Sequence, residues 1–284
     1  MTKEPVNIQK KWTNETYVGA NGKKSLIDLS IPSNFDGDLV IFIHGYMGFK
    51  DWGCWSLVED YFLRAGKAFC KYNVSHNGCS IEHPEDFVDL EAFGRNTYTK
   101  ELADLNAVVE WIKSKEIGGY RTHLIGHSRG GGIALLAGNV IDNISSITTW
   151  AAISDIEKRF PKEKDLEDWK ESGVRIQKNG RTKQELPLFY AQFEDFQVNK
   201  EKLNIEESVK KLQQPLLIIH GTEDTSVLLE EGENIARWSG KELTNIPNTA
   251  HTFDSKHPWN EEEMPLGLSK VCKLALDFIN KNHG

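Results

Sequence analysis

The strongest constraint on the fold is a series of short, mainly apolar runs that end at a glycine or a serine. Four of them are DLVIFIHG (38–45), RTHLIGHS (121–128), SITTWAAIS (146–154) and QPLLIIHG (214–221). A strand with one solvated face alternates apolar and polar residues, whereas a strand inside a parallel sheet is buried on both faces and reads as a nearly continuous apolar run. The sequence therefore predicts a mostly parallel sheet with both faces covered.

Helical patterns between these runs supply the covering layers. From Thr97 to Lys115 the apolar residues fall at helical spacing, with Asn96 or Thr97 as the cap. A short apolar helix is expected after residue 130, and a last helix around 268–278. Strands that alternate with helices predict an α/β fold, a mostly parallel central sheet flanked by helices on both faces. Further strand candidates near the N-terminus are NIQKKW, SLIDLSI and, more weakly, GKAFCKYNVS.

Residues 154–214 depart from this alternation. The segment is rich in Lys and Glu and contains KNGR, which predicts a two-residue hairpin turn at Asn179 and Gly180. We interpret the segment as a small inserted cap between two strands of the sheet. Residues 1–153 and 215–284 would then form the α/β core.

Composition and charge exclude several classes of function. The net charge of −8 leaves no basic surplus to neutralise phosphates, so we expect no nucleic-acid partner. MTKEPVNIQKKW contains no apolar signal region, and no run approaches the roughly 18 apolar residues of a membrane span. Cys54, Cys70, Cys79 and Cys272 lack CxxC spacing and are typical of a reduced set, so we expect neither a disulfide nor zinc. We therefore expect a cytoplasmic chain with no membrane partner.

The segment GHSRG (126–130) fits the pattern G-x-S-x-G in the context that gives this pattern its meaning. It follows a predicted buried strand and opens a predicted helix. The sharp reversal forces Ser128 into a strained backbone conformation, and the flanking glycines remove side chains that would collide with the neighbouring elements. Ser128 would then project at the carboxyl edge of the sheet, with the backbone N–H of Arg129 pointing at a developing oxyanion. The alternative is an ordinary glycine-rich turn with an incidental serine.

A serine hydroxyl needs a base and an acid, expected in the chain order Ser, Asp, His. Asp224 follows the run 214–221 and so lies at the same edge as Ser128. The rival acid is Asp155, which also ends a strand, whereas Glu223 is interpreted as solvated.

The predicted base is His251, in the loop IPNTAHTFD after the short strand ELTNI. The rival base is His257, but Pro258 follows it and its loop is charged. His220 precedes a glycine at a strand end and is interpreted as a core or turn residue.

The loop HGYMGFKDWG, after the first apolar run, is the expected source of a second oxyanion donor. The backbone N–H of Tyr46 is the predicted donor, with that of Met47 as the alternative. His44 and Gly45 would shape the loop. The other interpretation is a simple turn that contains glycine.

Together, HGYMGF, GHSRG, HGTED and TAHTF resemble the α/β-hydrolase superfamily over nearly the whole chain. Within it, HGYMGFKDWG, NVSHNG and FDSKHPW are similar to bacterial hydrolases near the dipeptidyl-peptidase and acylaminoacyl-peptidase branch and near the cinnamoyl (feruloyl) esterases. The D-x-x-G-x-G motif of these relatives appears here as NVSHNGCS, and the chain lacks the length for the β-propeller of the peptidases. The resemblance implies an α/β-hydrolase fold with an inserted cap.

The expected activity is hydrolysis of carboxylic esters of small molecules through Ser128, His251 and Asp224, with no metal or organic cofactor. A peptidase or amidase acting on short peptides or acyl-amides is the next hypothesis, ahead of acyl transfer, thioester hydrolysis and noncatalytic binding. The cap aromatics predicted either to line the acyl pocket or to form the core of the cap are Trp169, Phe189, Phe193 and Phe196. The last helix and an edge strand are compatible with a homodimer but do not require one.

Overall fold

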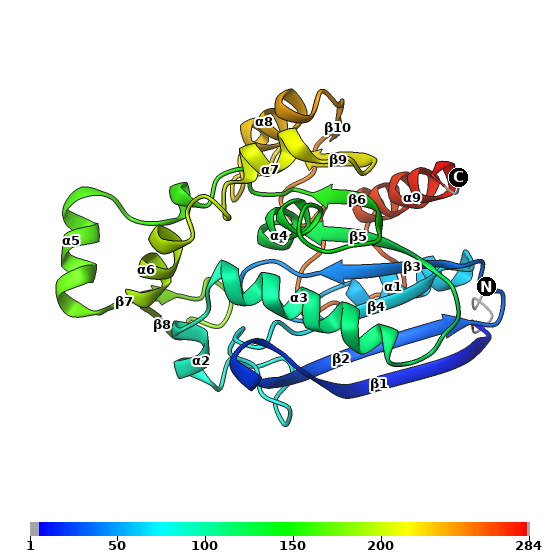
Figure 1. Ribbon diagram of the computed structural model, residues 1–284, viewed down its shortest axis with the longest axis horizontal. Coiled ribbons are helices and arrows are strands. Elements are labelled where there is room, and N and C mark those ends of the chain that lie inside the picture. Colours follow the sequence, from blue (N-terminus) through cyan, green and yellow to red (C-terminus); the bar gives the residue numbers. More distant parts are fainter. Residues whose placement is uncertain (1–5, 283–284) are drawn as a thin grey trace.

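The computed structural model describes residues 6–282, and its centre is an eight-stranded sheet in the order β1-β2-β4-β3-β5-β6-β9-β10 (Figure 1). β1 and β4 pair antiparallel with β2, and the remaining neighbours pair parallel. The mostly parallel sheet predicted from the apolar runs is therefore confirmed. The strands are β1 (Ile8–Val18), β2 (Lys24–Pro32), β3 (Asp38–Ile43), β4 (Ala68–Tyr72), β5 (Arg121–His127), β6 (Ile144–Trp150), β9 (Leu216–Gly221) and β10 (Leu243–Ile246).

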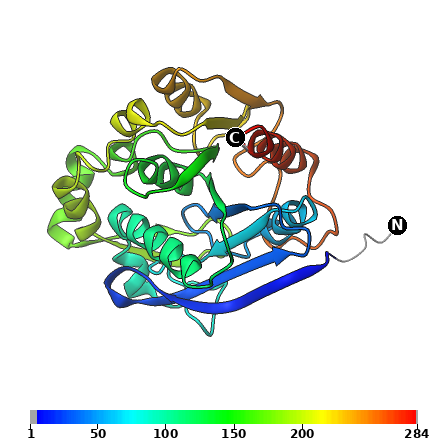
Figure 2. The ribbon, with the colours of Figure 1, turned by 45° about the vertical axis from the view of Figure 1, so that its right-hand side comes forward.

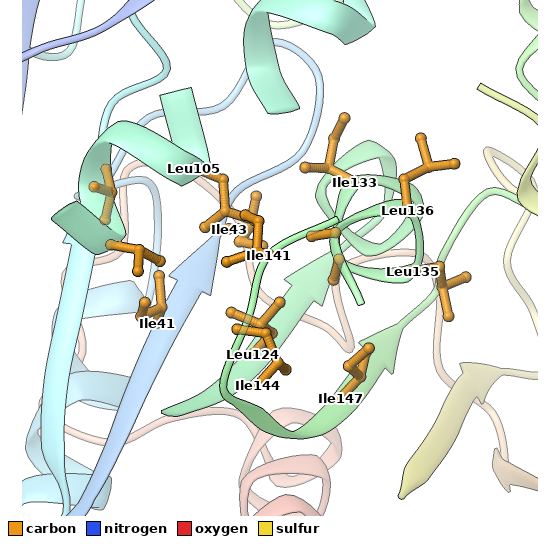
Figure 3. Packing of buried hydrophobic residues seen from close by; sticks show 14 of the residues in the cluster. Ile41, Ile43, Leu105, Leu124, Ile133, Leu135, Leu136, Ile141, Ile144 and Ile147 are labelled. Carbon is orange, nitrogen blue, oxygen red and sulfur yellow. The ribbon is translucent and has the colours of Figure 1, made fainter. Parts of the chain in front are cut away.

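Helices cover both faces of the sheet, as the two ribbon views show (Figures 1 and 2). In β3, Ile41 and Ile43 pack with α3 and α4, whereas Val40 and Phe42 pack with α1 and α9. Figure 3 shows the first of these layers. Successive residues are thus buried on opposite faces, which is why the run reads as continuously apolar. The helices are η1 (Ala20–Gly22), α1 (Trp55–Arg64), α2 (Leu90–Gly94), α3 (Tyr98–Lys113), α4 (Arg129–Ala137), α8 (Leu229–Ser239) and α9 (Leu266–Lys281).

The helix predicted from Thr97 to Lys115 is α3. Its N-cap is Thr97, whose side chain accepts a hydrogen bond from the backbone N–H of Lys100 at 3.2 Å. This choice between the two predicted caps follows from geometry, because Thr97 has extended backbone angles before the first helical turn.

The segment between β6 and β9 holds its own small elements. Figure 1 places α5, β7, β8 and α6 together at one end of the molecule. The last helix of this segment, α7, instead packs against α4 and α8. The division of the chain into a core and a cap of residues 154–214 stays a prediction. The elements are η2 (Glu157–Arg159), α5 (Glu163–Ser172), β7 (Val174–Lys178), β8 (Glu185–Phe189), α6 (Ala191–Val198) and α7 (Ile205–Lys211).

The predicted hairpin lies where expected, but the prediction of a two-residue turn at Asn179 and Gly180 is wrong. β7 and β8 pair antiparallel, and Lys178 faces Glu185 across a loop of residues 179–184. The side-chain Oδ1 of Asn179 accepts hydrogen bonds from the backbone N–H groups of Arg181 and Thr182, at 2.9 and 3.3 Å. These bonds stabilise the longer loop. An Asn side chain can accept backbone hydrogen bonds in this way, so the dipeptide Asn-Gly does not by itself fix a two-residue turn.

The four cysteines are free and buried. Burial raises the pKa of every one of these thiols, which suits packing and disfavours the reactive thiolate. Between residues 6 and 282, no helix combines the length and the apolar character that a bilayer crossing requires. The same residues contain no group of three or more His, Cys, Asp or Glu side chains arranged to hold a metal ion.

Candidate active site

Ser128 occupies a sharp turn between β5 and α4. Its backbone angles, φ 57° and ψ −120°, lie in a region that non-glycine residues rarely adopt. Two hydrogen bonds, one to the last residue of β6 and one to the segment that follows it, hold the turn. The N–H of Ser128 donates to the carbonyl oxygen of Trp150 at 2.8 Å, and its own carbonyl accepts from the N–H of Ile153 at 3.2 Å. The neighbouring strand thus holds the strained residue in place.

The glycines on either side of Ser128 are sterically required. A Cβ on Gly126 would lie 2.3 Å from the carbonyl oxygen of Gly130, and a Cβ on Gly130 would lie 2.3 Å from that of Ile43. Both distances are far below van der Waals contact, and the opposing atoms belong to the backbone. The glycines therefore allow β5, α4 and β3 to approach closely around the serine.

The structure brings the three predicted catalytic side chains together. The Nε2 atom of His251 lies 2.9 Å from the Oγ atom of Ser128, and its Nδ1 atom lies 2.7 Å from Oδ2 of Asp224. In the tautomer that satisfies both contacts, Nδ1–H donates to Asp224, and Nε2 accepts a hydrogen bond from the hydroxyl of Ser128. This arrangement can activate a hydroxyl as a nucleophile.

The carboxylate of Asp224 is surrounded by donors. Its Oδ1 accepts from the backbone N–H groups of Ser226 and Val227, at 2.8 and 2.9 Å. Burial by itself raises the pKa of Asp224, but the hydrogen bonds from His220 and His251 outweigh it and hold this pKa well below its ordinary value. The carboxylate is therefore ionised and can stabilise a protonated His251.

His220 lies fully buried in β9, and its Nε2 atom is 2.8 Å from the carbonyl oxygen of Val227 and 3.3 Å from Oδ2 of Asp224. The prediction of a core residue agrees with its burial. Sequence reasoning did not predict the contact between His220 and Asp224. The one signal for it is that His220 lies four residues before Asp224 in HGTED.

The rival residues lie elsewhere. Asp155 accepts a hydrogen bond from the N–H of Lys158 at 3.2 Å and lines a separate cavity beside α7. His257 accepts from the N–H of Gly53 at 2.9 Å and packs against aromatic rings. Glu223 is exposed, as the sequence predicts. Neither rival contacts Ser128 among the described residues.

His127 directly precedes Ser128 in GHSRG, and it supports the predicted base, His251. Its Nε2 atom donates to the carbonyl oxygen of His251 at 3.0 Å, and the two rings lie 4.8 Å apart. Burial, reinforced by the neighbouring His251, lowers the pKa of His127 to about 3. A neutral His127 can thus hold the backbone of His251 without adding a charge to the site. Sequence reasoning did not assign this role.

The predicted oxyanion donors lie beside Ser128. Tyr46 and Arg129 both line a cavity that contains Ser128. Neither backbone N–H donates to another protein group within residues 6–282. Met47 takes a positive φ of 56° in the turn that the bond from Gly48 N–H to Gly45 O closes at 3.1 Å. Both N–H groups are thus available to an oxygen at Ser128, and their role stays a prediction.

Two cavities meet at Ser128 and His251. The larger has a volume of about 470 Å³ and extends under the β7–β8 hairpin, and the smaller has a volume of about 210 Å³. Tyr46 contributes to both walls, and its hydroxyl donates to Oε1 of Gln177 on β7 at 3.0 Å. Two separate spaces beside one serine suit the two halves of a small substrate.

Of the four aromatic side chains predicted to line the substrate pocket, Trp169 lines the larger cavity. Phe189 lies against Gly94 and under the guanidinium of Arg95, 5.2 Å from the ring centre. Phe193 and Phe196 pack with Phe160, at ring distances of 5.3 and 5.1 Å. None of these three phenylalanines lines either cavity. Phe193 and Phe196 pack with another residue of the predicted cap, which is the alternative that the sequence left open, whereas Phe189 contacts residues outside that segment.

Comparisons with known proteins identify this architecture as the α/β-hydrolase fold. A family model described as the alpha/beta hydrolase fold matches residues 38–173, and no curated protein matches. The ferulic acid complex of Est1E from Butyrivibrio proteoclasticus has a TM-score of 0.70 and 21% identity over 94% of this chain and 99% of that one. Dienelactone hydrolase from Anabaena variabilis has a TM-score of 0.64 and 17% identity, with coverages of 96% and 97%.

A third similar structure is the acylaminoacyl peptidase of Pyrococcus horikoshii, with a TM-score of 0.66 and 17% identity over 99% of this chain and 43% of that one. At such identities the likeness shows the fold. The resemblance on which the sequence-based expectations depend is confirmed at this level.

Proposed function

We propose that this chain, which has the α/β-hydrolase fold, is a serine hydrolase that cleaves carboxylic esters of small molecules. The observation that supports the proposal most strongly is the continuous hydrogen-bonded series from Ser128 Oγ through His251 to Asp224. The strained backbone of Ser128 and the two cavities at its hydroxyl also support it.

The first half of the reaction makes an acyl-enzyme. Oγ of Ser128 attacks the acyl carbon while Nε2 of His251 takes the hydroxyl proton. The backbone N–H groups of Tyr46 and Arg129 stabilise the oxyanion of the tetrahedral intermediate. The bond to the alcohol oxygen then breaks, and His251 returns the proton to that oxygen.

In the second half, water attacks the acyl carbon and His251 takes its proton. The second tetrahedral intermediate releases the carboxylic acid, and the proton returns to Ser128. Asp224 fixes the tautomer of His251 and stabilises its protonated form in both halves.

A peptidase or amidase is the second candidate. Est1E is described with ferulic acid, whereas another similar structure is an acylaminoacyl peptidase, and the same triad can attack either an ester or an amide. The chain spans 43% of that peptidase.

A fluorophosphonate probe tests the nucleophile directly. We expect labelling at Ser128 that the Ser128→Ala variant abolishes, together with loss of 4-nitrophenyl ester turnover. Ser226, whose side chain lines the same cavity, supplies the matched control Ser226→Ala, which should still be labelled. Ester turnover by Ser128→Ala at the wild-type rate would refute the proposal. Faster cleavage of aminoacyl anilides than of acyl esters would favour the peptidase.

A further inference from the structure

The larger cavity is lined by three arginines. Arg129 begins α4, Arg159 ends η2 and Arg175 lies on β7, so they come from separate elements. No Asp or Glu side chain contributes to this wall among the described residues. Since the chain as a whole carries a net charge of −8, such a wall is unlike the rest of the protein.

Arg129 is buried directly beside the nucleophile. Its side chain is 10% exposed, and Oε1 of Glu101 lies 2.7 Å from its Nε atom. Despite this ion pair, Nε and Nη2 are buried without a well-aligned hydrogen-bond partner among the described residues. The guanidinium lies over the ring of Tyr98 at 3.7 Å. Part of its donor capacity is therefore unused in the protein alone.

Arg159 is also paired, because its Nη2 atom contacts Oε1 of Glu231. Glu231 accepts from the backbone N–H of Ser154 at 2.7 Å, so it belongs to the surrounding structure.

Arg175 differs from the other two. No carboxylate pairs with it among the described residues, and its guanidinium lies 6.0 Å from the ring centre of Trp169. It alternates along β7 with Gln177, and both side chains line the cavity. Two of the three cations are thus neutralised by carboxylates outside the cavity, and one positive charge remains.

We infer that the substrate is an ester that carries a carboxylate, bound in the larger cavity by Arg175 with help from Arg129 or Arg159. This inference deepens the proposed function and rests on it. A single uncompensated charge matches a monoanion, and the guanidinium fork matches the two oxygens of a carboxylate. The wall of the smaller cavity includes Trp52, Trp55 and Met47, and its one arginine, Arg181, is exposed to solvent. This cavity receives the uncharged half of the ester.

Paired substrates test the inference, because each pair differs in one charge. Mono-4-nitrophenyl adipate against 4-nitrophenyl hexanoate places the carboxylate on the acyl half. Next, 3-(4-acetoxyphenyl)propanoate against 4-propylphenyl acetate places it on the alcohol half. We expect kcat/KM to favour the carboxylate in one pair by about tenfold or more, mainly through KM. Added salt should reduce this preference.

The variant Arg175→Gln should reduce the preference ratio about tenfold in that same pair. Arg181→Gln is the matched control, because Arg181 lines the smaller cavity. Its ratio should stay at the wild-type value. A ratio at or below one in both pairs overturns the inference. So does a ratio that depends on Arg181 and not on Arg175.

A binding measurement separates this inference from the proposed chemistry. In titration calorimetry, the Ser128→Ala protein should bind the carboxylate member more tightly in at least one of two pairs. The pairs are monomethyl adipate with methyl hexanoate, and 3-(4-acetoxyphenyl)propanoate with 4-propylphenyl acetate. The double variant Ser128→Ala, Arg175→Gln should lose that difference. If no ester is hydrolysed, the proposed function fails while this preference still supports an anion site. Equal binding within both pairs overturns the inference whether or not esters are hydrolysed.

Discussion

Replacement of Gly126 by alanine tests the steric basis of the site. The added Cβ would lie 2.3 Å from the carbonyl oxygen of Gly130, against an ordinary contact distance of at least 3.4 Å. The opposing atom is backbone at the start of α4, so no side chain can rotate away. We expect the helix and strand to separate by about 1 Å, and a forced shift in a packed core costs about 1–3 kcal/mol.

The same shift should move Ser128 and the N–H of Arg129 away from His251. A misplacement of about 1 Å in a catalytic group can reduce the rate by about 10²-fold. Urea denaturation measures the free energy of unfolding, and kcat/KM on a 4-nitrophenyl ester measures the effect on the site.

Gly119→Ala is the matched control. A Cβ on Gly119 would have no atom within 4 Å, and this residue lies just before β5. Its stability should remain within about 0.5 kcal/mol of the wild type. If Gly126→Ala matched the wild type in both stability and turnover, the steric reasoning would be refuted.

Two further predictions concern the groups around His251. Asp224→Asn should reduce kcat by about 10⁴-fold, as in a serine protease triad, because an amide stabilises the wrong tautomer of His251. If steady-state kinetics showed less than a tenfold loss of kcat, this role of Asp224 would be contradicted. His127 binds a proton at about pH 6.5 when unfolded, whereas burial lowers its folded pKa to about 3. The unfolded state therefore binds more protons as the pH falls below 6.5, so stability present above that value is lost progressively towards pH 3. Urea unfolding of His127→Gln should vary less between pH 6.5 and 4 than that of the wild type, and identical slopes would show that His127 does not contribute.

The sequence by itself determined the α/β class, the mostly parallel sheet and the position of Ser128 at a strand-to-helix turn. It also singled out Asp224 and His251, which the folded chain brings to hydrogen-bond distance of one another. These features can be predicted from the sequence because their causes act on adjacent residues. One cause is the burial of a strand on both faces, and the other is a chain reversal too tight for a side chain. Their trace in the sequence is therefore local.

Only the tertiary structure decided which side chains face the serine. The sequence names Phe193 and Phe196 as pocket or core candidates, but their partner, Phe160, lies far from them in sequence. The convergence of Arg129, Arg159 and Arg175 on one cavity has no local signal either, since they belong to three separate elements. The contents of a pocket depend on how distant segments pack, and that packing is a property of the whole chain.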